Sequence, residues 1–228
     1  MILKPPTISR IRRVWAKINN SGYGRTELTI IYEAIFVFSL GSGLFNTAYP
    51  AGLNQLGMSQ SNVFVVLLAG MAIQVAAFYM LGRREMKEKY IPAIVNSLSL
   101  RSASYIIIGA VFLFYSKIGA LITGLIFYPL ASGIAYAIYY TASNTLVFDS
   151  LKGAGRGSAL GAYTALMGVG TFLGALISGY CSFYLGYWVT FIVGGILILG
   201  SSIMFGRIRS LGQTLAGNKS LSSKMQII

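Results

Sequence analysis

The stretch that decides the fold is residues 63–89, which read VFVVLLAGMAIQVAAFYML and then GRREMKEK. The first part, Val63 to Leu81, is 19 residues without a charge, and the second part, Gly82 to Lys89, carries six charges. A helix of about 20 apolar residues covers the roughly 30 Å of hydrocarbon in a bilayer. The stretch therefore predicts a transmembrane helix that ends in a charged loop at the membrane surface.

Apolar blocks of the same kind recur on both sides of this stretch. The chain of 228 residues is 55% hydrophobic and 10% charged, with a mean hydropathy of +0.69, whereas about a quarter of a soluble protein is charged. Lipid offers no partner to backbone N–H and C=O groups, so each block is expected to be a helix. The expected spans are 29–53, 63–81, 92–115, 120–147, 159–183 and 189–205. The sequence therefore predicts an all-α integral membrane protein, a bundle of six transmembrane helices.

The basic residues favour one side of this bundle. Of the 18 Lys and Arg, 17 fall on the same side when successive spans alternate in direction, and only Lys117 falls on the other. Cytoplasmic loops are enriched in Lys and Arg, so both termini are expected in the cytoplasm and the protein in the cell membrane. Residues 1–27 are an expected basic cytoplasmic segment, 28–209 the bundle, and 210–228 a polar cytoplasmic tail.

The remaining composition narrows the chemistry. A net charge of +13 would suggest nucleic acid as the partner of a soluble protein, but here the basic residues lie between apolar blocks, so no nucleic-acid partner is expected. The chain has no histidine and one cysteine, Cys181, which excludes an internal disulfide, histidine zinc ligands and Ser-His dyads. No catalytic residue, metal or cofactor is predicted, and the chain is not expected to be an enzyme.

Two spans carry polar residues at helical spacing. The first has Ser39, Ser42, Asn46 and Tyr49, and the fourth has Ser132, Tyr136, Tyr139 and Ser143. Steps of three and four place each set on one helix face, which must meet other helices or water because lipid cannot satisfy it. Two interpretations stay open, hydrogen bonding between helices and the wall of an aqueous cavity. On the second, the path of a polar but not strongly charged solute is lined by Asn46, Tyr49, Tyr136 and Tyr140, with Tyr140 beside the stripe.

Four charged residues are candidates for gating or ion pairing, namely Glu33, Arg101, Asp149 and Arg156. Ionisable groups at membrane depth mark functional sites by default. Glu33 and Asp149 lie near the predicted cytoplasmic surface, where snorkelling or pairing at a helix end accounts for them. Arg101 lies deeper, in the cytoplasmic half of the third span, and we expect a structural or gating pair there rather than contact with a solute.

The fifth span is rich in glycine. Small residues let helix backbones approach closely in lipid, so Gly161, Gly170, Gly174 and Gly179 are expected to pack against neighbouring helices. The sixth span has few polar residues and is expected to face lipid.

Several stretches resemble the major facilitator superfamily of transporters. Residues 156–161, RGSALG, and 170–179, GTFLGALISG, are similar to a cytoplasmic loop and glycine motif in one half of that family, with Ala175 and Ser178 where proline and glycine are usual. Gly82-Arg83-Arg84 resembles a reduced copy of the family's signature loop, without its aspartate. Together with the basic segment before the first span, residues 10–209 resemble helices seven to twelve. The resemblance implies that spans one and four line a cavity, with spans three and six outside.

The resemblance also implies a function, which is one half of a secondary transporter that moves a small solute by alternating access. Because the family's site lies between two six-helix halves, the expected partners are the lipid bilayer, a small-molecule solute and a second six-helix half. That half is the missing N-terminal part of a longer chain, a separate chain or a second copy, and the first two are preferred. The alternatives are a non-transporting scaffold or truncated half, and a membrane enzyme acting on a lipid-linked substrate, for which the five acids supply no catalytic cluster.

Overall fold

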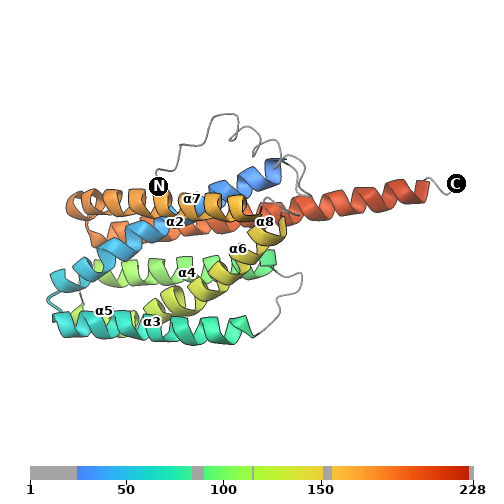
Figure 1. Ribbon diagram of the computed structural model, residues 1–228. Coiled ribbons are helices and arrows are strands. Elements are labelled where there is room, and N and C mark those ends of the chain that lie inside the picture. The colour runs from blue at the N-terminus through green and yellow to red at the C-terminus, as the bar shows by residue number, and fades with distance from the viewer. Residues whose placement is uncertain (1–24, 84–89, 115, 151–155, 226–228) are drawn as a thin grey trace, which may run out of the picture.

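The computed structural model describes residues 25–83, 90–114, 116–150 and 156–225, and within these ranges it is helical with no strand. The helices are α2 (Arg25–Gln55), α3 (Gln60–Gly82), α4 (Tyr90–Leu113), α5 (Lys117–Tyr128), the π-helix η1 (Pro129–Ala135), α6 (Tyr136–Ser150), α7 (Arg156–Tyr184) and α8 (Tyr187–Met225). They form one bundle, from which the end of α8 extends (Figure 1).

Six helical segments are long and apolar enough to cross a membrane. They are Thr29–Gln55, Gln60–Gly82, Tyr90–Leu113, Lys117–Phe148, Ala159–Tyr184 and Tyr187–Ile208. This confirms the prediction of an all-helical chain with six candidate spans. The fourth span consists of α5, η1 and α6 in succession, and Pro129 begins the π-helical part. Proline lacks a backbone donor and crowds the carbonyl four residues earlier, so the wider π turn coincides with a real interruption of the hydrogen-bond ladder.

Short turns join the first span to the second and the fifth to the sixth. Gly57 and Gly186 lie in these turns with φ of 75° and 88°, a conformation that glycine adopts without steric cost. Ser59 then caps α3, its hydroxyl oxygen accepting from the backbone N–H of Asn62 at 3.3 Å. The chain thus reverses direction within a few residues, which keeps successive spans antiparallel.

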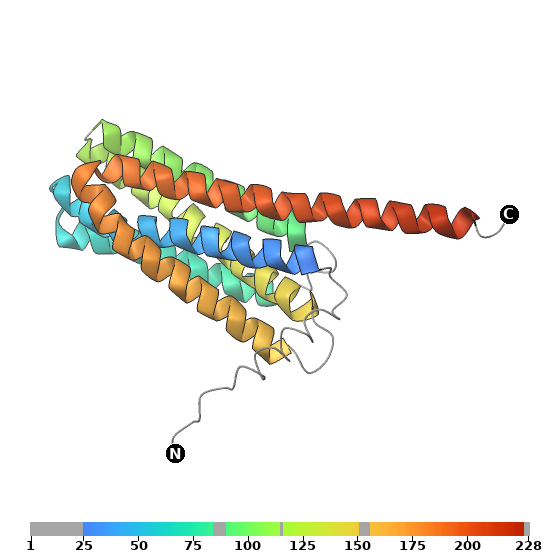
Figure 2. The same cartoon turned by 90° about the horizontal axis from the view of Figure 1, so that it is seen from above.

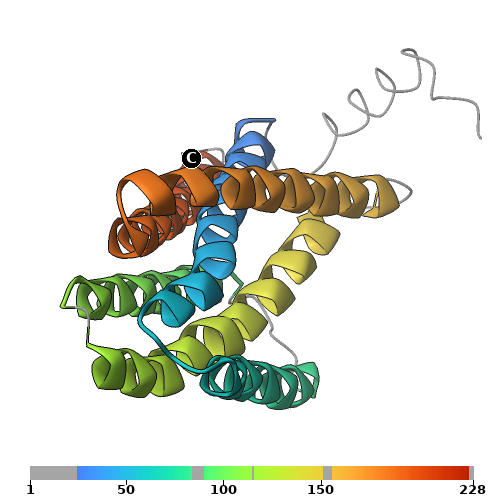
Figure 3. The same ribbon diagram turned by 90° about the vertical axis from the view of Figure 1, so that its left-hand side faces the viewer.

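The main helix contacts relate the first three spans to the last three. α2 packs along α7 and α8, α4 packs along α8 and the fourth span, and α3 packs along the fourth span. In span numbers the pairs are 1 with 5, 1 with 6, 3 with 6, 3 with 4 and 2 with 4. Exchanging spans 1, 2 and 3 for 4, 5 and 6 turns the first pair into the last, turns the second into the fourth and leaves the third unchanged. The bundle therefore has the pairing of two three-helix repeats. Figure 3 shows this arrangement from one end.

Several helix ends that adjoin basic segments of the sequence lie at one end of the bundle. The start of α2, the end of α6 and the start of α7 lie there, and α8 extends from the same end (Figure 2). α8 continues to Met225, so most of the predicted tail 210–228 belongs to this helix. Residues 1–24 of the predicted basic segment lie outside the described residues.

The prediction that the sixth span faces lipid is wrong for one of its faces. That face is buried between α2 and α4 and includes Thr190, Phe191, Ile198, Ser201 and Phe205. Ser201 donates a hydrogen bond to the carbonyl oxygen of Ala34 in α2 at 2.7 Å, and Ser102 of α4 donates to that of Gly195 at 2.8 Å. A few serines suffice to join helices in lipid when each finds a backbone partner, so α8 holds α2 and α4 together.

The glycines of α7 lie on two different faces. A Cβ added to Gly170 would meet the Cβ of Ser39 in α2 at 2.8 Å, and one on Gly174 would meet the carbonyl oxygen of Leu40. At Gly161 and Gly179 an added Cβ would have nothing within 4 Å. The expectation that these two pack against a neighbour is therefore wrong for this bundle. Each is nine residues from Gly170, or 2.5 helical turns, which places it on the opposite side of α7.

Candidate functional site

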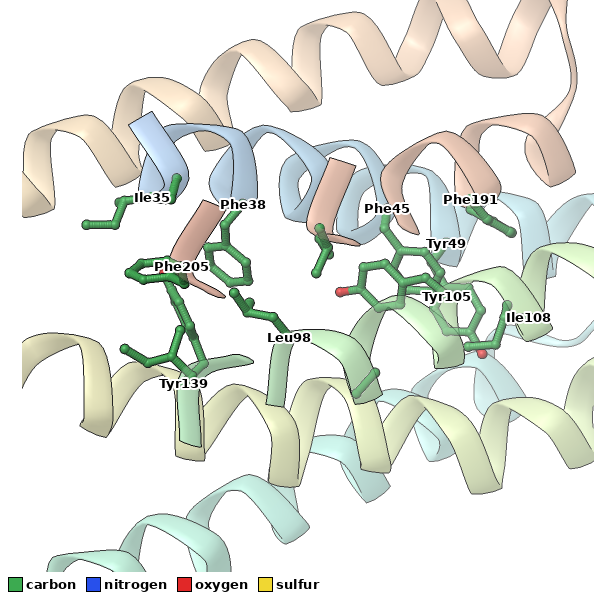
Figure 4. Packing of buried hydrophobic residues seen from close by; sticks show 14 of the residues in the cluster. Ile35, Phe38, Phe45, Tyr49, Leu98, Tyr105, Ile108, Tyr139, Phe191 and Phe205 are labelled. Atoms are coloured by element: carbon green, nitrogen blue, oxygen red, sulfur yellow. The ribbon is translucent and has the colours of Figure 1, made fainter. Parts of the chain in front are cut away.

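Two groups of buried aromatic residues fill the core, one toward each end (Figure 4). Phe38 belongs to the first, with its ring centroid 4.0 Å from that of Tyr139. Tyr105 belongs to the second, where it stacks on Phe45 at 3.5 Å. The guanidinium carbon of Arg101 lies 5.3 Å from the ring centroids of both Phe38 and Tyr105. A charged side chain is therefore held between the two aromatic groups.

Arg101 lies at the middle of its span. It is the twelfth of the 24 residues of α4 and only 2% exposed, which places it about 17 Å from the start of the helix and about 18 Å from its end at 1.5 Å per residue. This position is at the inner boundary of the cytoplasmic half in which the sequence predicts Arg101. Of the 18 Lys and Arg, setting aside Arg101 leaves 16 on the predicted cytoplasmic side and Lys117 on the other, so the argument for orientation stands.

A directed chain of hydrogen bonds runs from this arginine to the surface. The Nε of Arg101 donates to the hydroxyl of Tyr105 at 2.9 Å, and that hydroxyl donates to Oδ1 of Asn46 in α2 at 3.3 Å. Asn46 is exposed. Because a guanidinium can only donate, the tyrosine hydroxyl must pass its own proton onward, and the amide of Asn46 is turned with its oxygen inward. The two N–H groups of Asn46 Nδ2 take no part in this chain.

No anion balances the charge of Arg101 among the side chains that the structure describes. Its Nη1 is buried without a hydrogen-bond partner. Glu33 is the one acid whose side chain is described, and it is exposed near the start of α2. The candidates Asp149 and Arg156 have side chains outside the described set, although the helix backbone puts Asp149 thirteen residues beyond Tyr136, roughly 20 Å along the axis. A charge left alone in a protein interior costs about 3–5 kcal/mol, so the pair expected for Arg101 is missing from this part of the chain.

Tyr136 separates the guanidinium from the open side of the bundle. Its ring centroid lies 5.0 Å from the guanidinium carbon, and cations are attracted to the faces of aromatic rings within about 6 Å. Tyr136 is half-buried and stacks on Tyr140, which is 38% exposed, with 5.8 Å between centroids. Phe78 of α3 meets both rings edge-on. Arg101 thus contacts Tyr136 directly and Asn46 through the hydroxyl of Tyr105, and Tyr140 joins the group through its stacking on Tyr136.

A hollow continues from Tyr140 between α6 and α7. Its volume is about 350 Å³, and its lining consists of Tyr140, Asn144, Thr145, Phe148, Leu160 and Thr164. Thr145 and Thr164 donate to carbonyl oxygens one turn earlier on their own helices, so their hydroxyl oxygens remain available as hydrogen-bond acceptors. Asn144 continues the line of Tyr136 and Tyr140 at four-residue steps, a signal that the sequence carried and that could have identified it.

Other members of the predicted stripes serve the packing of helices. Tyr49 is fully buried, stacked on Tyr128 at 5.0 Å, and does not join Asn46 on the open side. Ser143 of α6 shares a hydrogen bond of 2.9 Å with the hydroxyl of Tyr163 in α7. The interpretation as hydrogen bonding and packing between helices is therefore confirmed for these two residues, and the aqueous cavity stays a prediction for Asn46, Tyr136 and Tyr140.

Sequence reasoning did not assign Tyr105 or Phe38 to the site. Tyr105 follows Arg101 by one helical turn, which brings residues on one face into contact, and this spacing could have identified it. Phe38 comes from another helix, and nothing in its local sequence separates it from the other buried aromatics. Comparisons with family models, with curated proteins and with solved structures gave no match to the chain.

Proposed function

We propose that the chain is one six-helix half of a facilitator-type secondary transporter of the major facilitator superfamily, moving a small solute by alternating access together with a second six-helix half. The observation that carries this proposal is the helix pairing, which is unchanged when the first three spans are exchanged with the last three. Transporters of this family are built from three-helix repeats nested within each six-helix half, and they bind solute near the bilayer midplane.

The open polar face supports the same proposal. Asn46 comes from the first span and Tyr136 and Tyr140 from the fourth, the two spans that line the cavity in the family that the sequence resembles. Polar groups at membrane depth need water or protein beside them, and a second half would enclose this face. α3 and α7 are the least buried spans of the bundle, and they flank the face that a second half would cover.

Orientation in the cell membrane, with both termini in the cytoplasm, is part of the proposal and can be tested first. Single cysteines at Gln60, Lys117 and Gly186, each in a Cys181→Ser background, should react with an impermeant thiol reagent added outside intact cells. Cysteines at Lys87 and Lys152 should react only after the membrane is opened. The reverse pattern would contradict the assigned topology.

Alternating access is tested with cysteines at Asn46 and Tyr140 in the same background, in native membranes where any second half is present. We expect an impermeant thiol reagent to label both positions in right-side-out vesicles and also in inside-out vesicles, because the face opens to each side in turn. A cysteine at Val66, which is fully buried, is the matched control and should stay unlabelled. Labelling from one side only, or from neither, would favour a non-transporting scaffold.

A further inference from the structure

We propose that Arg101 binds the negative charge of the solute and that the solute is a singly charged carboxylate. This inference rests on the proposed function where it says that the bound anion is a transported solute. The binding of the anion itself is argued from Arg101 and its neighbours. It differs from the expectation drawn from the sequence, which gave Arg101 a structural or gating partner within the protein and expected a solute that is polar but not strongly charged.

The hydrogen-bond chain leaves only donors toward the open side. The Nε of Arg101 donates its hydrogen bond to Tyr105, and the two N–H groups of Nη1 have no partner among the described residues. Asn46 spends its Oδ1 on the hydroxyl of Tyr105, which leaves the two N–H groups of Nδ2. A ligand that fits these two groups accepts hydrogen bonds from both of them, as a carboxylate does.

The charge of the site sets the charge of the ligand. The other basic residues with described side chains are Arg83, Lys117 and Arg207, all of them exposed, so Arg101 is the one buried cation in the part of the chain described. One guanidinium is neutralised by one negative charge, whereas a phosphate dianion would leave a negative charge at mid-membrane, which is costly. A lipid headgroup is also a poor match, because Arg101 lies about 17 Å from the start of α4 and about 18 Å from its end.

The neighbouring rings describe the rest of the ligand. Tyr136 lies between the guanidinium and the surface, and Tyr140 and Phe78 continue the aromatic wall. Tyr136 is only half-buried, so a change of its side-chain rotamer, a fast motion for a partly exposed residue, uncovers Arg101. Aromatic walls around one charged anchor are typical of a small ligand that is part apolar.

The experiment uses the full chain in nanodiscs of neutral phosphatidylcholine, with the thermal unfolding midpoint as the readout. Acetate, butyrate and benzoate are the probes, benzamide is the uncharged control, and inorganic phosphate and discs containing phosphatidylglycerol test the other anion sources. We expect at least one monocarboxylate to raise the midpoint by roughly 3 °C at saturating concentration, with no effect of benzamide. Arg101→Gln should abolish this rise.

Asn46→Asp tests the charge balance without any added ligand. Its carboxylate would stand beside the donors that await an anion, so the ligand-free midpoint should rise and the response to carboxylate should fall. Thr47→Asp is the matched control, because it adds the same charge at the next exposed position of α2 and should raise nothing.

Several results would overturn the proposal. They are no response of the wild type to any of the three monocarboxylates, an equal response to benzamide, a response that survives Arg101→Gln, or a larger response to phosphate or to phosphatidylglycerol. Binding in nanodiscs does not require transport. If the cysteines at Asn46 and Tyr140 fail to label from both sides while the Arg101-dependent response is present, the anion site stands and the transport function fails. If both cysteines label from both sides but no carboxylate raises the midpoint, the transport function stands and the anion site fails.

Discussion

The seam between α2 and α7 and the seam between α3 and the fourth span are counterparts in the exchange of three-helix units, yet they are built differently. In the first, backbone meets backbone. A Cβ on Gly174 would meet Leu40, Leu44 and Gly43 at main-chain atoms, and one on Gly43 would meet the carbonyl oxygen of Thr171. Main-chain atoms cannot change rotamer, so a larger residue in this seam would have to displace a whole helix.

In the second seam glycines mostly face side chains. A Cβ on Gly70 of α3 would meet the ring of Tyr128 at 2.5 Å, and one on Gly133 of η1 would meet Cγ2 of Ile73 at 2.9 Å. Side chains can change rotamer where backbones cannot, and this seam also contains the π-helical segment, a feature found frequently at functional sites. The seam of α2 with α7 is therefore a backbone seam, in which main-chain atoms meet. The seam of α3 with the fourth span is a side-chain seam, in which glycines mostly meet side chains.

The largest effect is expected in the backbone seam, at Gly174→Leu. The new side chain must displace main-chain atoms of α2, so we expect a loss of about 3 kcal/mol or more in the free energy of unfolding, at the upper end of overpacked sites. Folded yield and thermal midpoint in detergent measure it. A midpoint equal to that of the wild type would show that α2 and α7 are not in contact at this level.

A smaller effect is expected in the side-chain seam between α3 and the fourth span, at Gly70→Ala. The methyl group meets the Tyr128 ring, which can shift, so we expect a loss of about 1 kcal/mol. Adding Tyr128→Leu should recover part of the loss by making room, a coupling that a double-mutant cycle measures.

Gly174→Ala is the control for this comparison. The new methyl group would meet main-chain atoms of α2. Truncating a side chain of α2 makes no room there, so no second substitution in α2 should restore the stability. Equal sensitivity of the two alanine variants, or rescue of both, would remove the distinction between the seams.

The smallest effect is expected on the outer face of α7, at Gly161→Leu and Gly179→Leu. An added side chain meets nothing within 4 Å there, so the thermal midpoint of the chain by itself should change by no more than the equivalent of about 0.5 kcal/mol. A clear destabilisation would mean that this face is covered, and repeating the measurement with the proposed second half present would identify that half as the cover.

Much of the fold could be predicted from the sequence because span length and apolar content are set by the bilayer. The six spans and the turns at Gly57 and Gly186 follow from runs of apolar residues and from a backbone position that suits glycine. The faces of α7 could also have been separated, since nine residues make 2.5 turns. The prediction that all four glycines pack against neighbours took no account of this spacing, which puts Gly161 and Gly179 opposite Gly170.

The candidate site could be predicted only in part. Asn46 and Tyr136 were predicted through helical spacing, which is a property of one helix, and Tyr140 as the neighbour of that stripe. Tyr49 was misplaced because spacing gives a shared face without saying which neighbour the face meets. The position of Arg101 between Phe38 and Tyr105, and the burial of one face of α8, depend on contacts between helices distant in sequence, and no local pattern reports those contacts.

The depth of Arg101 has an electrical consequence. Moving one elementary charge across the whole membrane is worth about 2.3 kcal/mol per 100 mV, and a charge at mid-span feels part of that field. In the proposed cycle the empty bundle carries this positive charge within the field, while the bundle that holds a monocarboxylate carries no net charge there. The resting voltage of the cell would then bias the orientation of the empty form and leave the occupied form indifferent, so that the return step rather than the delivery step would respond to depolarisation.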